Sequence, residues 1–175
     1  MIEPIEPAHA DCLFGGLSDS RLYEFIDATP PVNVDRLRRR YEDWSFRRQE
    51  EGGELWLNWA IRRTERDQYV GVLQATVDAK ATATIAYVLF RSEWGKGYAR
   101  EAVGLMIETL IREHGVSRLR ATVDPSNERS ISLLFALGFQ RHESSAEELD
   151  TRLGEPGDLV FARPAIVPVV DSQGA

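Results

Sequence analysis

The fold and the chemistry of the chain depend on residues 91–100, which read RSEWGKGYAR. An apolar, strand-like run precedes this stretch, and a helical pattern of apolar residues follows it. Gly95, Gly97 and Ala99 allow the backbone to approach a ligand closely. The free N–H groups of the following first helical turn point outward beside the positive end of the helix dipole. The stretch therefore predicts a phosphate cradle between a strand and a helix.

Three kinds of phosphate-binding loop compete for this turn. A Walker A loop needs Ser or Thr after Gly-Lys, but here the pair is followed by Gly97. A dinucleotide-binding fingerprint needs a third glycine where Arg100 stands. The pyrophosphate loop of acyl-CoA-dependent N-acyltransferases needs Gly-x-Gly or Gly-x-Ala, which Gly97-Tyr98-Ala99 supplies, with Lys96 and Arg100 adding charge. A glycine turn that merely joins strand to helix is the alternative that the turn alone leaves open.

On both sides of the turn, some segments have apolar residues at helical spacing and others have apolar runs typical of strands. Helical spacing predicts helices near residues 8–17, 21–26, 35–49, 99–113 and 127–137. Apolar runs predict strands near residues 55–61, 69–77, 84–90, 119–123 and 159–162, with another starting at Phe139. The first three strands follow one another through short polar turns, which predicts an antiparallel meander. We expect one α/β domain over residues 1–163, with a flexible tail over 164–175.

Composition supports a single globular domain. The chain has 175 residues, of which 43% are hydrophobic and 28% charged. The net charge of −7 argues against general nucleic-acid binding, which needs a basic face. Cys12 is the single cysteine and the three histidines are scattered, so no disulfide framework and no metal site is expected. No apolar run reaches membrane-spanning length and no secretory pattern opens the chain, so a cytoplasmic location is expected.

Residues 85–139 resemble the GNAT superfamily of N-acetyltransferases, and within it the branch of ribosomal-protein alanine acetyltransferases. The order and spacing of several short pieces carry the resemblance. These pieces are Ala86-Tyr87, Trp94-Gly95-Lys96-Gly97-Tyr98-Ala99, Glu101-Ala102, Val123-Asp124-Pro125 with Asn127, Ser130-Ile131 and Leu137-Gly138-Phe139. The resemblance implies a mixed, mostly antiparallel sheet of about six or seven strands flanked by about four helices. It also implies acetyl-CoA as co-substrate, with no metal.

The same resemblance implies where acetyl-CoA binds. The strand ending at Phe90 would splay from the strand at 119–123 and leave a slot for the thioester, its backbone pairing with the pantetheine arm. The N–H groups of residues 95–100 would hold the pyrophosphate, and Asn127 would hydrogen-bond the arm. The residues expected to bind acetyl-CoA are Val88, Phe90, Gly95, Lys96, Gly97, Tyr98, Ala99, Arg100 and Asn127.

One position departs from the family pattern. Many superfamily members carry a tyrosine seven residues after the asparagine as general acid for the leaving thiolate, and here that position is Leu134. We expect Ser130 to take this role, with Tyr87 as second candidate. Neither side chain ionises near neutrality, so each would act mainly as a hydrogen-bond donor.

The remaining chemical groups are less defined by the sequence. A strand N–H near Val88 or Leu89 could stabilise the oxyanion. No carboxylate lies on the strand over residues 82–90, so Glu24 and Glu54 are base candidates by position alone. Three tryptophans could line an acceptor pocket, namely Trp44, Trp56 and Trp59. Aromatic residues on helices and strands are, however, more often part of the hydrophobic core.

The expected function is transfer of an acetyl group from acetyl-CoA to a primary amine by direct attack in a ternary complex. The amine, on a protein N-terminus or a small molecule, is not readable, and neither nucleic acid nor membrane is expected as a partner. A monomer or a homodimer is expected. Two alternatives remain: a catalytically silent acyl-CoA-binding sensor, motivated by Leu134, and a nucleotide-binding or structural domain whose glycine turn is accidental.

Overall fold

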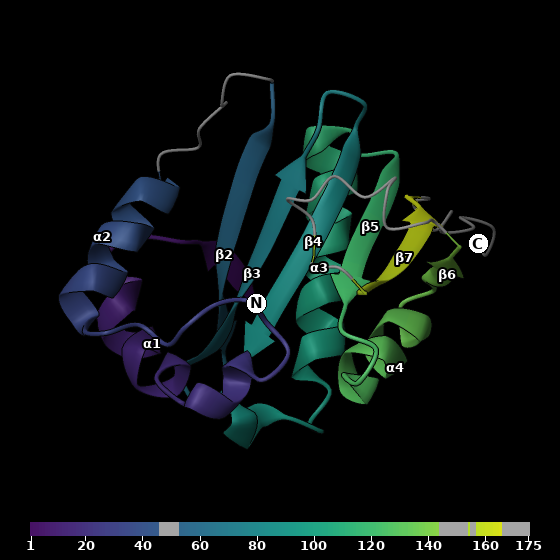
Figure 1. The fold of residues 1–175 in the computed structure, drawn as a ribbon. Helices are drawn as coiled ribbons and strands as arrows, with labels where there is room; N and C mark the ends of the chain where they lie inside the picture. Colours follow the sequence, from purple (N-terminus) through teal and green to yellow (C-terminus); the bar gives the residue numbers. More distant parts are fainter. Residues whose placement is uncertain (46–52, 144–153, 155–156, 166–175) are drawn as a thin grey trace, which may run out of the picture.

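A single mixed sheet organises the chain. The computed structural model describes residues 1–45, 53–143, 154 and 157–165. Seven strands form the sheet in the order β1-β2-β3-β4-β5-β7-β6 (Figure 1). The strands are β1 (Ile2–Pro4), β2 (Leu55–Arg63), β3 (Gln68–Val77), β4 (Thr82–Leu89), β5 (Arg118–Val123), β6 (Gln140–His142) and β7 (Leu159–Pro164). Neighbouring strands are antiparallel except β4 and β5, which are parallel. The predicted mixed, mostly antiparallel sheet and its opening meander are therefore confirmed.

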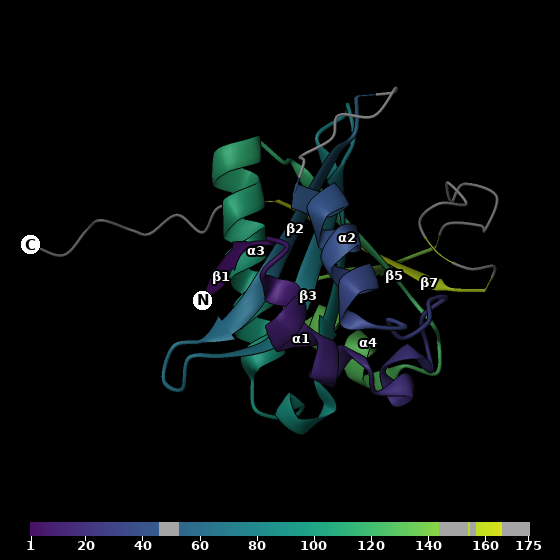
Figure 2. The same ribbon diagram turned by 90° about the vertical axis from the view of Figure 1, so that its left-hand side faces the viewer.

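Helices cover both faces of this sheet. The helices are α1 (His9–Leu17), α2 (Val34–Ser45), α3 (Tyr98–His114) and α4 (Glu128–Ala136), with short 3-10 helices η1 (Ser20–Tyr23) and η2 (Arg91–Glu93). Figure 2 shows α1 and α2 on one side of the sheet and α3 on the other. Apolar residues of α4 join the same buried cluster as those of α3. The sheet thus separates an α1–α2 face from an α3–α4 face.

Helix α3 illustrates how sequence period becomes packing. Its buried residues recur every three or four positions and form one stripe that lies against the sheet. The helix ends at Gly115, whose φ of 63° lies in the left-handed region, and whose N–H donates to the carbonyl of Leu110. On the other face of the sheet, Leu13 of α1 and Leu37 and Tyr41 of α2 are buried almost completely. Two apolar layers therefore hold the helices on the sheet.

The two central strands diverge after three residues of pairing. Thr82, Ala83 and Thr84 of β4 pair with residues 118–120 of β5, but β4 continues to Leu89 and β5 to Val123 without further pairing between them. The predicted divergence of these two strands is confirmed. The space between the unpaired parts of the two strands is the β4–β5 gap. Because an unpaired strand edge leaves backbone N–H and C=O groups without ladder partners, this gap offers free polar backbone.

A few elements differ from the sequence prediction. Strand β1 has no alternating pattern of its own and becomes a strand by pairing with residues 59–61 of β2. The helix predicted over 21–26 is a shorter 3-10 helix at Ser20–Tyr23. The expected helix end near residue 49, most of the loop after His142 and the tail over 166–175 lie outside the described residues. Among those described, no helix is long and apolar enough to cross a bilayer.

Candidate active site

The glycine turn forms an open cradle at the start of α3. Gly95 and Gly97 have φ angles of 74° and 86°, in the left-handed region that glycine adopts without strain. Gly97 is the N-cap of α3 and has no side chain with which to cap this helix end. A Cβ added at either glycine would meet no protein atom within 4 Å. The first-turn N–H groups are thus free to face an anion, and the cradle fits a pyrophosphate.

Ion pairs connect the glycine turn to strand β2. The carboxylate of Glu93, whose side chain is 12% exposed, lies 3.3 Å from both Arg63 of β2 and Lys96 of the turn. The guanidinium of Arg63 also lies 4.9 Å above the ring of Tyr98. Lys96 therefore has a partner within the protein, whereas Arg100 is exposed on the first turn of α3. These contacts position the turn that the sequence predicts to bind the co-substrate.

Trp94 links the end of β4 to the start of α4. Its indole Nε1–H donates to the carbonyl of Leu89 at 2.9 Å. The guanidiniums of Arg91 and Arg129 lie 5.6 and 4.8 Å from the indole ring. The sequence prediction missed Arg129, although its place in the first helical turn after Asn127 is the signal that could have found it. The result is a positively charged bridge at the open end of the β4–β5 gap.

Backbone alternation decides which groups of β4 face the gap. The N–H of Phe90 donates to Val70 of β3 at 2.9 Å, and its carbonyl accepts the N–H of Glu93 at 2.9 Å. Backbone groups alternate sides along an antiparallel strand, so those of Val88 also face β3. The backbone groups of Val88 and Phe90 are therefore turned away from the gap. A contact of either residue with the co-substrate would have to be made by its side chain, and this stays a prediction.

The backbone groups directed at the gap belong to the residues between. Tyr87 and Leu89 alternate with Val88, so their N–H and C=O groups point away from β3 toward β5. The contact of Trp94 with the Leu89 carbonyl agrees with this direction. Of the two oxyanion donors considered from the sequence, near Val88 or Leu89, the geometry favours the N–H of Leu89.

The two predicted proton donors meet beside the gap. The hydroxyl of Tyr87, on β4, lies 2.7 Å from the hydroxyl of Ser130, on α4. Burial raises the pKa of Tyr87, and the hydrogen bond with Ser130 offsets part of this rise. The phenol consequently remains protonated around neutrality. The pair can donate a hydrogen bond or a proton but cannot serve as a carboxylate-like base.

Helix α4 contributes Asn127 at its N-terminus and Leu134 in its interior to the comparison with the family pattern. The Oδ1 atom of Asn127 accepts the N–H of Ser130 at 3.1 Å, so Asn127 caps α4 and orients the first turn that carries Ser130. Leu134 has no exposed surface and belongs to the main hydrophobic cluster. A leucine there leaves this position without a proton donor, and Ser130 and Tyr87 are the hydroxyls that the fold supplies nearby.

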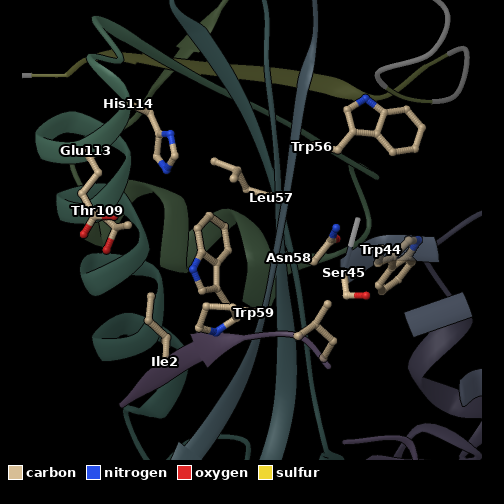
Figure 3. A pocket seen from close by; sticks show the side chains of 12 residues that line it. Ile2, Trp44, Ser45, Trp56, Leu57, Asn58, Trp59, Thr109, Glu113 and His114 are labelled. Atoms are coloured by element: carbon tan, nitrogen blue, oxygen red, sulfur yellow. The ribbon is translucent and has the colours of Figure 1, made fainter. Parts of the chain in front are cut away.

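The pocket lined by Trp44, Trp56 and Trp59 lies away from the β4–β5 gap. Figure 3 shows Trp56, Trp59 and Trp44 around strand β2, with Glu113 and His114 at the end of α3. That end of α3 is about 20 Å or more from Gly97, since a helix rises about 1.5 Å per residue. The three tryptophans therefore line a hollow at the sheet edge rather than the β4–β5 gap.

Of the two base candidates taken from the sequence, Glu54 lies away from the gap. Glu54 directly precedes the end of β2 that pairs with Val77, and the gap opens toward the other end of the sheet. Glu24 is exposed at the end of η1.

Comparison with known proteins gives this geometry a family. The acetyltransferase (GNAT) domain family matches residues 1–140. The uncharacterized N-acetyltransferase p20 of Bacillus licheniformis is 30% identical over 145 residues, covering 80% of this chain and 78% of that protein.

Solved structures share the fold at lower identity. The ribosomal-protein-S5-alanine acetyltransferase of Vibrio fischeri superposes with a TM-score of 0.77 at 16% identity, covering 94% of this chain and 92% of that one. The spermidine N-acetyltransferase of Vibrio cholerae, solved with CoA and spermine, gives 0.73 at 12% identity, covering 94% and 95%. With the family match, the relative and the cradle in agreement, the chain belongs to the GNAT family of acetyltransferases and is an acyltransferase.

Proposed function

We propose that this protein transfers an acetyl group from acetyl-CoA to a primary amine within a ternary complex. The observation that carries the proposal is the convergence of two features on the β4–β5 gap. One is the open helix N-terminus at Gly97, and the other is the hydrogen-bonded pair of Tyr87 and Ser130. The fold is shared with an acetyltransferase solved in complex with CoA, which supports the same co-substrate here.

In this proposal the chain binds acetyl-CoA through backbone more than through side chains. The N–H groups of residues 95–100 hold the pyrophosphate, and Arg100 adds positive charge. The gap-facing backbone groups of Tyr87 pair with the pantetheine arm as a strand edge pairs with a peptide, and the N–H of Leu89 is kept for the oxyanion. Asn127 keeps its side-chain NH₂ group for the arm, because its Oδ1 is used in capping α4.

The proposed chemistry asks the protein to position groups and to stabilise charge. The amine nitrogen attacks the thioester carbonyl, a C–N bond forms, and the N–H of Leu89 stabilises the oxyanion. The C–S bond then breaks, and the thiolate takes a proton through the hydroxyls of Ser130 and Tyr87, while the proton lost by the amine passes to water. The raised pKa of Tyr87 keeps that phenol protonated for this step.

A second candidate function follows from Leu134. Leu134 stands where many family members carry a tyrosine as general acid, and this departure favours a silent acyl-CoA-binding sensor. The sensor and the enzyme share the binding site and differ only in turnover with amines.

A thermal-shift titration tests the binding half of the proposal. Acetyl-CoA at about 100 times its Kd should add about 2.7 kcal/mol to the free energy of unfolding, or roughly 5–10 °C in Tm. ATP and NAD serve as controls, and the Gly97→Asp variant should lose the shift because its carboxylate would face the pyrophosphate. A Tm that no concentration of acetyl-CoA raises, or that ATP raises equally, would overturn the assignment of this cradle.

A further inference from the structure

Strand β5 presents a polar row on the face of the sheet away from α3 and α4. Leu119, Ala121 and Val123 are buried in the cluster formed with α3 and α4. Side chains alternate along a strand, so Arg118, Arg120 and Thr122 face the opposite side, the α1–α2 face. We place the acceptor on that side, because α3, α4 and the Tyr87–Ser130 pair occupy the other one.

Arg120 stands where the β4–β5 gap begins. Thr84 and Arg120 form the last pair between β4 and β5, and on its other side Arg120 pairs with Ala162 of β7. Two residues beyond Thr84 on the same face, Ala86 is exposed. Tyr87 lies three residues from Thr84, or about 10 Å along the strand. A group attached to an amine at the gap can therefore reach the Arg120 side chain.

The charge of Arg120 is not compensated by its surroundings. Arg120 is half-buried. Within the part of the chain that the structure describes, no ion pair, side-chain hydrogen bond or ring contact holds its guanidinium. Its paired neighbours Thr84 and Ala162 are uncharged, and the carboxylate of Asp158, directly before β7, lies near Gly154 and Thr122. By contrast, Arg38 and Arg62, which are likewise half-buried, are ion-paired.

Burying part of a guanidinium without a hydrogen-bond or ion-pair partner costs free energy, unless a ligand supplies that partner. Its planar fork of donors matches a carboxylate or a phosphate. We propose that Arg120 binds an oxyanion carried by the acceptor, so that the preferred substrate is a small primary amine bearing a carboxylate or phosphate rather than a polyamine. This inference rests on the proposed function, since it assumes that the amine reacts at the gap.

Matched amines and matched variants test the proposal. Acetyl transfer is measured for amino acids, for the corresponding amino-acid amides, for phosphoethanolamine and for spermidine. Arg120→Gln should lower kcat/KM for the anionic amines about tenfold to a hundredfold and leave the amides unchanged, because one charged hydrogen-bonding partner is lost. Arg118→Gln, on the same face but exposed at the strand start, is the control and should change neither. Comparison of carboxylate with phosphate amines tells which oxyanion is preferred.

A binding readout separates this inference from the proposed function. Calorimetry with the protein saturated in CoA measures the affinity for the same amines without turnover. Binding of an anionic amine that Arg120→Gln weakens, without any transfer, would support the site while refuting the enzyme. Preference of the wild type for spermidine, equal losses for acids and amides, or absence of binding and transfer for every anionic amine would each overturn the role of Arg120.

Discussion

The hydroxyl groups of Tyr87 and Ser130 lie 2.7 Å apart and join strand β4 to helix α4 beside the point where the central strands separate. Neither residue reaches this arrangement alone. Tyr87 is brought there by the β3–β4 ladder, and Ser130 by the first turn that Asn127 caps. In the proposed reaction, this pair supplies the proton that the leaving thiolate takes up.

Removing either hydroxyl should slow transfer without weakening acetyl-CoA binding. We expect Tyr87→Phe and Ser130→Ala each to lower kcat about tenfold to a hundredfold. The double variant should lose little more than the worse single variant, because the two act as a unit. Thiol release measures kcat, and titration of acetyl-CoA measures binding. A double variant with wild-type kcat would remove both residues from the reaction.

The pH profile of transfer offers a separate test of Tyr87. The pKa of Tyr87 is raised above the ordinary value of 10.0 by burial. The phenol should therefore remain protonated, and kcat should show no loss from its ionisation below about pH 10. In Tyr87→Phe any loss of rate above that pH should disappear. A wild-type decline near neutrality that the variant abolishes would contradict a phenol that stays protonated at that pH.

The two ends of α3 provide a matched comparison for the cradle. Gly97 and Gly115 both have positive φ angles, 86° and 63°, and neither has protein atoms within 4 Å of an added Cβ. Alanine at either position should cost about 1–2 kcal/mol of stability from backbone strain. Only Gly97→Ala should also weaken acetyl-CoA binding, by about tenfold, because its methyl group projects into the cradle. Equal affinities in the two variants would place the co-substrate elsewhere.

Acid should loosen the attachment of the N-terminal strand. Burial alone would raise the pKa of Glu3, but hydrogen bonds with Tyr69 and His9 and the charge of Arg62 together lower it below its ordinary 4.5. A lowered pKa gives stability that is present above the unfolded value and lost as the pH falls through the folded value. The stability difference between wild type and Glu3→Gln should thus shrink between about pH 6 and pH 3. Urea unfolding measures it, and a pH-independent difference would contradict the ion-paired role of Glu3.

The buried hydroxyl of Tyr41 should be dispensable. Tyr41 is 1% exposed, and within the described residues its hydroxyl has no hydrogen-bond partner. Tyr41→Phe removes this unsatisfied group and should leave stability unchanged or raise it by up to about 1 kcal/mol. Tyr41→Ala should cost about 3–5 kcal/mol because it empties the layer under α2. A large loss in the phenylalanine variant would show that the hydroxyl has a partner.

Much of the fold follows from the sequence because its elements are strongly periodic. The apolar stripe of α3, the alternating run at β2 and the apolar runs at β3 and β4 fix the type and approximate bounds of these elements. Strand β1 could not be found this way, since its three residues are ordered by their partners on β2. The ion pair of Glu93 with Arg63 at the cradle could not be found either, because Arg63 is distant in sequence.

The backbone turn of the candidate site could be predicted from the sequence, whereas the contacts between residues distant in sequence could not. Gly95 and Gly97 are recognisable because positive φ angles select glycine. The register that turns Leu89 rather than Val88 toward the gap requires knowledge of which β4 residues pair with β3. Arg120 carries no motif, and its place at the start of the gap is known only from its pairing with Thr84.

The most direct test of the proposed function is whether the purified protein acetylates an amine. The protein, acetyl-CoA and a mixture of primary amines are incubated, and products are identified by mass spectrometry alongside thiol release, with Tyr87→Phe plus Ser130→Ala as control. We predict an N-acetylated amine that forms in step with free CoA and is strongly reduced in the control. Tight binding of acetyl-CoA with no acetylated product from any amine would contradict the enzyme and leave the acyl-CoA sensor.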